Sequence, residues 1–313
     1  MKILITGGCG FKGTVLIEKL LKDGHEILNL DNRWFGNYLD DHPRLKNIKC
    51  DIRDMKLDYF DGVERIIHLA NIANDPAVDL NPVMSWEVNV LAGQRLAENA
   101  IKAGVKQIIY ASSGSVYGIK EEEKVTEELD LVPISVYNKT KMVAERVFLS
   151  YSDRLQIHCI RPATVCGLSK RMRLDVSVNL LTFQALRNKK ITVLGGAQTR
   201  PNIHIDDMIR VYDHFLRNFE IQSGFFNAGF ENISILDIAK LIKSKIDCEI
   251  EVNPSNDPRS YKLDSSKLMS TGFKPLKGIS DAIDEIINSY KKGLLEDKEE
   301  FYTVRWMKKN KFK

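Results

Sequence analysis

Cysteine is scarce in this sequence, and the few cysteines are not arranged for a shared function. There are five in 313 residues, and none of them form a C-x-x-C pair. An odd, scattered set predicts reduced thiols packed inside the protein. The six histidines show no metal-ligand spacing, and His68 and His204 stand in apolar, strand-like segments where we expect hydrogen-bonded core residues. The sequence therefore predicts neither disulfides nor a metal site.

Long apolar runs are also missing. No segment approaches the ~20 apolar residues that cross a bilayer, and the chain starts directly with a strand-like run that leaves no space for a signal peptide. The net charge is only +4, and no arginine-rich or aromatic-interleaved segment favours nucleic-acid binding. The basic residues 307–313 are expected to form a solvated terminus. These absences predict a cytoplasmic protein without membrane or nucleic-acid partners.

Glycine, by contrast, is concentrated near the start, in the stretch MKILITGGCGFKGTVLIEKLLKDGHEILNLD. Residues 3–5 form a short apolar run typical of a buried strand, and apolar residues then recur at helical spacing. Between them, Gly7 would permit a tight turn, and Gly10 would let the backbone approach a pyrophosphate at the helix N-terminus. Gly13 would let helix and strand pack closely. This order predicts a dinucleotide-binding unit, against the alternative of a plain turn between strand and helix.

An acid closes the unit: Asp31 stands where the second strand, over 25–30, is expected to end. A carboxylate at this position accepts hydrogen bonds from ribose hydroxyls and repels a 2′-phosphate. The predicted cofactor is therefore NAD rather than NADP. Arg33, two residues further on, is the one feature that would instead favour the phosphate.

Strand-like and helix-like segments alternate over the first half of the chain. Further strands are predicted at 47–51, 64–71, 107–113 and 155–162, with helices at 82–103 and 135–151. Such alternation predicts an α/β fold with a Rossmann-type, doubly wound parallel sheet, which binds ligands beyond the carboxyl ends of its strands. The alternation stops near residue 165. We therefore expect an NAD-binding domain over 1–165 and a smaller C-terminal α/β substrate lobe over 166–313, with the chain free to cross between them.

A second chemical signal is the segment YNKTK, in which Tyr137 and Lys141 are four residues apart and share one face of the predicted helix. An ammonium near a phenol favours the phenolate, which lowers the pKa of the tyrosine and suits it as general base for a sugar hydroxyl. Ser113, at the end of the preceding strand, could hydrogen-bond the same hydroxyl. A chance pair is the alternative interpretation, but the serine-tipped strand in a nucleotide-binding fold favours catalysis.

Together these motifs resemble a known family. TGGCGFKG, the aspartate at 31, CDIRD, HLAN, EVNV, SSGSVYG, YNKTK and RPNIHIDD are similar to the extended short-chain dehydrogenases/reductases, in particular the NAD-dependent nucleotide-sugar epimerases and dehydratases. The resemblance implies that Tyr137 and Lys141 are the catalytic pair and Ser113 the catalytic serine. It implies NAD contacts from Gly7, Gly10, Phe11, Lys12, Asp31, Asn32, Asp51, Ile52, Leu69, Ala70, Asn71, Asn89, Ser112, Tyr137, Lys141 and Pro162.

The resemblance also implies a nucleotide-diphosphate sugar as substrate, oxidised at a hydroxyl, usually that of C4. Substrate contacts are expected from Ser115, Thr164, Arg171, Arg173, Asn179, Arg200 and Arg259. The segment GLSKRMRLDVSVN is similar to a bacterial subgroup that includes C4-oxidising enzymes acting on GDP-heptoses. A 4-epimerase or C4 dehydrogenase is the favoured activity. A dehydratase or 4-ketoreductase of the same family, or a non-catalytic NAD-binding regulator, are the alternatives.

Departures from the family pattern sharpen the expectation. Sugar 4,6-dehydratases place an Asp-Glu pair after the catalytic serine, where this chain has Gly114 and Ser115, so 4,6-dehydration is not expected. Lys12 replaces an apolar residue in the glycine turn.

The helices over 82–103 and 136–150 resemble those that pair into a four-helix bundle, which predicts a homodimer. Its seam would contain Leu91, Leu96, Val143 and Val147, unless these residues face the sheet instead.

Overall fold

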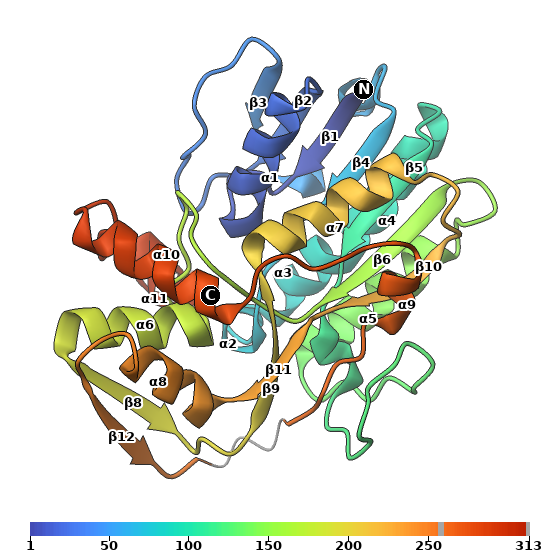
Figure 1. The fold of residues 1–313 in the computed structure, drawn as a ribbon. Coiled ribbons are helices and arrows are strands. Elements are labelled where there is room, and N and C mark those ends of the chain that lie inside the picture. Colours follow the sequence, from blue (N-terminus) through green and yellow to red (C-terminus); the bar gives the residue numbers. More distant parts are fainter. Residues whose placement is uncertain (256–259, 311–313) are drawn as a thin grey trace.

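The computed structural model describes residues 1–255 and 260–310, and its centre is a seven-stranded sheet (Figure 1). The strand order is β3-β2-β1-β4-β5-β6-β10, and all pairs are parallel. The chain runs outward from β1 to β3 and returns on the other side of β1, so the switch point lies between β1 and β4. This confirms the predicted doubly wound sheet. The strands are β1 (Lys2–Thr6), β2 (Glu26–Asp31), β3 (Leu45–Lys49), β4 (Arg65–His68), β5 (Gln107–Ala111), β6 (Gln156–Pro162) and β10 (Gly224–Ala228).

Helices cover both faces of this sheet. They include α1 (Phe11–Lys22), α4 (Ala92–Lys102), α5 (Val136–Leu149) and α7 (Ile205–Arg217). Successive strand residues point to opposite faces, and β1 follows this rule. Ile3 and Ile5 join the core cluster that contains residues of α1 and α7, whereas Leu4 joins the cluster that contains residues of α4 and α5. The sheet is therefore buried on both sides, as its run of apolar residues requires.

The long helix predicted over 82–103 is present, but a π-helical turn interrupts it. The turn η3 (Glu87–Leu91) lies between α3 (Pro82–Trp86) and α4. Leu96 is fully buried against the sheet and Leu91 is 50% exposed. For Leu96 the alternative of facing the sheet therefore holds, because this leucine is part of the core. Val143 and Val147 are half-buried against the same cluster.

The smaller lobe has its own core and lies below the carboxyl edge of the large sheet in Figure 1. A three-stranded sheet has the order β11-β9-β7, and a two-stranded sheet pairs β12 with β8. The elements are β7 (Thr164–Cys166), α6 (Ser177–Asn188), β8 (Lys190–Leu194), β9 (Thr199–His204), β11 (Glu231–Ser234), α8 (Ile235–Lys243), β12 (Glu249–Asn253) and α10 (Ile279–Lys291). Shorter helices and turns are α2 (Asp75–Val78), α9 (Ser266–Ser270), α11 (Thr303–Lys309), η1 (Ile52–Asp54), η2 (Leu57–Phe60), η4 (Gly114–Tyr117) and η5 (Glu299–Phe301).

The chain crosses between the two parts. Although they follow residue 165, α7 packs against α1 and β10 extends the large sheet beside β6.

All five cysteines are free, and four of them are buried, in agreement with the prediction of packed thiols. Within residues 1–255 and 260–310, no helix combines the length and apolar character needed to span a membrane.

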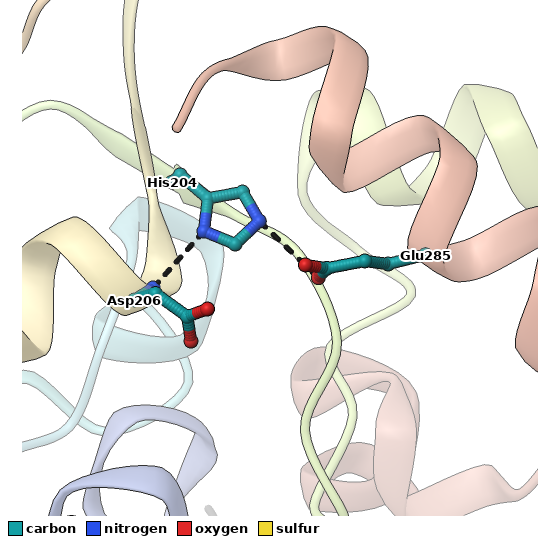
Figure 2. A group of neighbouring side chains, drawn as sticks. All are labelled: His204, Asp206 and Glu285. Atoms are coloured by element: carbon teal, nitrogen blue, oxygen red, sulfur yellow. Dashed lines mark hydrogen bonds and ion pairs between the residues drawn. The ribbon is translucent and has the colours of Figure 1, made fainter. Parts of the chain in front are cut away.

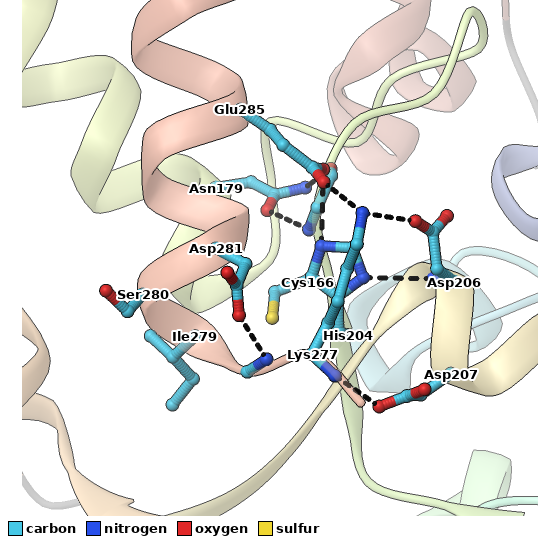
Figure 3. Close-up of polar contacts among 12 residues, drawn as sticks. Cys166, Asn179, His204, Asp206, Asp207, Lys277, Ile279, Ser280, Asp281 and Glu285 are labelled. Carbon is cyan, nitrogen blue, oxygen red and sulfur yellow. Dashed lines mark hydrogen bonds and ion pairs between the residues drawn. The ribbon is translucent and has the colours of Figure 1, made fainter. Parts of the chain in front are cut away.

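A polar cluster ties α7 to α10 (Figure 2). His204 Nδ1 accepts a hydrogen bond from the Asp206 N–H at 3.1 Å, and His204 Nε2 lies 3.2 Å from Glu285. Lys277 Nζ donates to Asp206 at 2.6 Å and to Glu285 at 2.7 Å (Figure 3). Burial raises the pKa of Glu285, but hydrogen bonds from His204 and Lys277 outweigh it and lower this pKa to about 2. Because the Lys277 ammonium already pairs with both carboxylates, we interpret the cluster as a structural ion-pair network, with His204 a hydrogen-bonded core residue as predicted.

Candidate active site

A cavity of about 1000 Å³ lies at the carboxyl edge of the large sheet. Its wall contains residues from the ends of β1, β2, β4, β5 and β6 and from the smaller lobe. This is the edge at which doubly wound sheets bind ligands. The sequence-predicted residues brought together here are Gly7, Gly10, Phe11, Lys12, Asp31, Asn32, Asp51, Ile52, Leu69, Ala70, Asn71, Ser112, Ser113, Ser115, Tyr137, Lys141, Pro162, Thr164, Arg171, Arg173 and Arg200. Arg259 lies outside the described residues.

The glycine turn forms one wall, and its glycines serve different purposes. Gly7 has φ +76°, and a Cβ there would lie 2.6 Å from the backbone nitrogen of Ala70. A Cβ on Gly13 would lie 2.5 Å from the Gly8 Cα, so this glycine permits the close packing of helix and strand. A Cβ on Gly10 would approach only the Gly7 carbonyl, at 3.2 Å. The backbone at Gly10 is therefore open to the cavity beside the N-terminus of α1, as a bound pyrophosphate requires.

Asp31 lies at the end of β2 with its carboxylate held in place by two backbone groups. It accepts from the Cys9 N–H at 2.9 Å and from the Arg33 N–H at 2.6 Å. Burial raises the pKa of Asp31. The Arg33 guanidinium donates to the Asn47 carbonyl at 2.9 Å and does not line the cavity. An acid at the ribose position, with the Arg33 guanidinium held by the Asn47 carbonyl, fits NAD better than NADP.

Two predicted contact residues, Asn89 and Asn179, do not line the cavity. Asn89 accepts from the Ile72 N–H at 2.8 Å and donates to the Ile72 carbonyl at 3.1 Å. Asn179 does the same to Gly167, at 3.0 and 3.2 Å, and also donates to the Arg173 carbonyl at 3.0 Å. The side-chain amide of each asparagine thus fixes the backbone of one loop next to the cavity. Their predicted direct contacts are corrected to positioning roles because their amide groups are already engaged by backbone.

The expected catalytic residues converge on one side of the cavity. Ser113 begins η4 directly after β5, and its hydroxyl lies 2.8 Å from that of Ser115. Tyr137 and Lys141 come from successive turns of α5. Lys141 is 1% exposed, and its Nζ donates to the Ala111 carbonyl, the last residue of β5, at 2.7 Å. Helix α5 is thereby fixed to the end of β5, the strand that precedes Ser113.

The pKa of Tyr137 is shifted in the direction opposite to the one expected from the sequence. Burial raises the pKa of Tyr137 to about 12, while a hydrogen bond with Ser113 and the charge of Arg173 act in the opposite direction. Burial also lowers the pKa of Lys141. The predicted lowering of the tyrosine pKa by Lys141 is therefore not found, because the Lys141 ammonium donates to the Ala111 carbonyl.

Another part of the cavity wall is cationic. Arg171 is 3% exposed and stacks over Phe35 with its Cζ 4.3 Å from the ring centroid. Its Nε finds no hydrogen-bond partner, and burial lowers its pKa to about 10, with the neighbouring charge of Arg173 as a second cause. Arg173 itself is paired with Asp175 at 2.8 Å. Arg200 lines the same cavity. Buried guanidinium groups of this kind are suited to the phosphates of a dinucleotide or nucleotide sugar.

The C-terminal segment contributes a part of the wall that the sequence did not indicate. Tyr302, Thr303, Arg305 and Met307 all line the cavity. The Thr303 N–H donates to Asp175 at 2.9 Å, and Met307 is 1% exposed. The expectation of a solvated terminus over 307–313 is thus wrong for Met307, although Lys308 and Lys309 are exposed. Trp34 and Phe35, after β2, also line the cavity unpredicted, and Phe35 packs against Trp306 with ring centroids 4.9 Å apart.

Comparison with known proteins adds to this geometry. The chain is 29% identical over 298 residues to a putative UDP-glucose 4-epimerase of Methanocaldococcus jannaschii, covering 91% of this chain and 97% of the relative. Among solved structures, it resembles a Bacillus cereus UDP-glucuronic acid 4-epimerase in complex with UDP-glucuronic acid and NAD, with a TM-score of 0.83, 28% identity, and coverage of 93% and 99% of the two chains. MoeE5 in complex with UDP-glucuronic acid and NAD gives a TM-score of 0.85 at 26% identity, covering 94% and 100%.

These likenesses extend over nearly the whole chain. NAD is the cofactor, and the chain is an enzyme. A model of the NAD dependent epimerase/dehydratase family matches residues 3–229, well over half of the sequence, and the protein therefore belongs to this family.

Proposed function

We propose that this enzyme oxidises a ring hydroxyl, that of C4, on a nucleotide-diphosphate sugar, acting as a 4-epimerase or a C4 dehydrogenase. The observation that carries the proposal is that Ser113, Tyr137 and Lys141 line the same cavity as the glycine turn and the arginine wall. In this proposal residues 1–165 mainly hold NAD. Residues 166–313 mainly hold the substrate, with Thr164 and Ser115 completing its site.

The catalytic residues have separate tasks in this reaction. Bound NAD supplies the hydride acceptor. Tyr137 removes the proton of the sugar hydroxyl as the C–H bond breaks, and Ser113 orients that hydroxyl and shares its hydrogen bond. Lys141, whose Nζ donates to the Ala111 carbonyl, holds the cofactor ribose. A keto sugar results, which is either released or reduced on its other face.

Dehydration is disfavoured by the residues that follow the serine. A 4,6-dehydratase needs an acid and a base beside the sugar, and Gly114 and Ser115 supply neither. The Ser115 hydroxyl is bonded to that of Ser113 at 2.8 Å. A Cβ on Gly114 would already lie 3.2 Å from the Pro162 carbonyl, so the backbone here leaves little space for a longer side chain.

Uridine diphosphate sugars are the first substrates to test. The similar structures hold UDP-glucuronic acid, and similar relatives are named as UDP-glucose 4-epimerases. The likeness of GLSKRMRLDVSVN to GDP-heptose enzymes makes GDP sugars the second group. A thermal-shift panel of nucleotide diphosphates with NAD present ranks the bases, since a ligand of the folded state stabilises it.

The deciding experiment is single-turnover reduction of bound NAD by each nucleotide sugar, followed by the absorbance of the reduced nicotinamide. Analysis of the released sugar separates an epimer from a keto product. We expect Tyr137→Phe to keep the fold and NAD binding but to reduce hydride transfer about 10²–10⁴-fold. Tyr151→Phe, with the same change on a tyrosine outside the cavity wall, is the control. Near-normal reduction in Tyr137→Phe would contradict the assignment of the base.

We also propose that the protein is cytoplasmic, which its five free thiols support. We further propose that it forms a homodimer through the long helices, which an exposed apolar strip supports. Val83, Trp86 and Leu91 are 71%, 36% and 50% exposed along α3 and η3. Light scattering at micromolar concentration should give the mass of a dimer, and Leu91→Asp should shift it towards the monomer. A monomeric wild-type protein would contradict the proposal.

A further inference from the structure

A second lysine–tyrosine pair lies beside the catalytic pair. Lys12 is in the first turn of α1 and lines the cavity. Its Nζ donates to the Tyr212 hydroxyl at 3.0 Å and lies 5.7 Å from the Tyr212 ring centroid. Tyr212 is fully buried on α7, which packs against α1. The ammonium of Lys12 is therefore held at a fixed place at the edge of the active-site cavity.

The groups that face this ammonium are known from each neighbouring element. They are Lys141 on α5, Arg173 on the loop before α6, and Tyr212 on α7. Across residues 1–255 and 260–310, no carboxylate lies within 4.0 Å of Lys12 Nζ. Burial lowers the pKa of Lys12 to about 8, with Arg173 as the second cause, and the charge of Lys12 contributes to the lowered pKa of Lys141.

An uncompensated charge in such a site has a direct consequence for the bound cofactor. Hydride acceptance removes one positive charge from the nicotinamide ring, and a nearby cation disfavours the charged form more than the neutral form. The charge of Lys12 acts on Lys141, and the charge of Arg173 acts both on Lys12 and on Tyr137, the residue that takes the proton of the sugar hydroxyl in the proposed reaction. The effect of Lys12 is thus exerted at the reacting centre.

We propose that Lys12 is an electrostatic residue of the active site: its ammonium, anchored by Tyr212, favours reduced over oxidised cofactor and so promotes the first, sugar-oxidising half of the reaction. With an apolar side chain at position 12, this preference would depend only on the remaining cations, Lys141 and Arg173. The alternative is that Lys12 only bridges α1 and α7.

The test compares the dissociation constants of NADH and NAD in the full-length protein without any sugar, by nicotinamide fluorescence and calorimetry. We expect Lys12→Met to shift the ratio of these constants about tenfold or more towards NAD, which is the size expected for a unit charge several ångströms away in a protein site. Lys12→Arg should restore most of the preference. Lys22→Met, the same change at the exposed end of the same helix, should leave the ratio unchanged.

The pH dependence gives a second readout that a bridging role would not produce. As pH rises through about 8, Lys12 loses its proton and the wild-type preference for NADH should fall. In Lys12→Met this step should be absent. Tyr212→Phe removes the hydrogen-bond acceptor of Lys12 but keeps the lysine, so the step should move to lower pH. If Lys12→Met does not fold, Tyr212→Phe replaces it in this test.

An unchanged ratio in Lys12→Met, or an equal change in Lys22→Met, would overturn the proposal. So would a Tyr212→Phe protein whose pH step coincides with that of the wild type. Because no sugar is present, these results are independent of whether the proposed sugar oxidation is correct. A protein that fails on every nucleotide sugar can still show the Lys12-dependent preference.

Discussion

The two walls of the cavity are built in different ways. The wall around the glycine turn is made of backbone: Gly7, Gly10 and the end of β2 are placed by one continuous βαβ unit of about thirty residues. Another part of the wall is made of side chains from distant segments, among them Arg171, Arg200 and Thr303. The first wall can therefore be specified locally, whereas the second exists only when several parts of the chain come together.

With the proposed function, this difference leads us to expect the two ligands at different parts of the wall. A backbone wall offers N–H groups and close approach, which suit a pyrophosphate common to all reactions of the family. A side-chain wall can change by single substitutions without changing the fold, which suits recognition of a particular sugar nucleotide. Arg171 is an intermediate case, because it stacks on Phe35, four residues after Asp31, and so lies towards the cofactor side.

The largest effect is expected from adding a methyl group to the backbone wall. Gly13→Ala should lower the free energy of unfolding by about 2–3 kcal/mol, because its Cβ would lie 2.5 Å from the Gly8 Cα. The better helix propensity of alanine offsets at most about 1 kcal/mol of this. Gly10→Ala should leave stability nearly unchanged and weaken NAD binding instead. Urea unfolding with and without NAD measures both, and equal behaviour of the two variants would contradict the separate roles.

The side-chain wall should respond in the opposite way. Arg200→Met should weaken binding of the nucleotide diphosphate roughly 10–100-fold, the value of a lost charged hydrogen bond, with NAD affinity and stability nearly unchanged. Arg171→Met should weaken NAD binding by a larger factor than it weakens the nucleotide diphosphate. Calorimetric titration of each variant with NAD and with UDP checks this. Equal losses for both ligands in both variants would remove the distinction between the walls.

The smallest effect concerns cofactor choice at the edge of the backbone wall. Asp31→Ala should reduce the preference for NAD over NADP about tenfold, since it removes both a ribose acceptor and a repelling charge. Asp41→Ala, an exposed acid on the following loop, is the control. Tighter binding of NADP than NAD by the wild type would show that Arg33 turns into the cavity when the phosphate is present.

Those features that depend on neighbours in sequence were predictable. The glycine spacing, Asp31 at a strand end, Ser113 after a strand and the i, i+4 relation of Tyr137 and Lys141 each follow from the geometry of one or two elements. The alternation of strands and helices likewise determined the sheet, and the structure confirms it. For these parts of the protein, the fold brings together what the local pattern already specified.

Contacts between distant segments were decided only by the tertiary structure. No local pattern indicates that Met307 reaches the cavity, that Leu96 rather than Leu91 faces the core, or that Tyr212 receives the Lys12 ammonium 200 residues away. The family resemblance predicts a ligand contact for Asn89, but the Asn89 amide is hydrogen-bonded to the backbone of Ile72. Sequence periodicity reports which face of an element is apolar, but the partner of a polar side chain depends on how the elements pack.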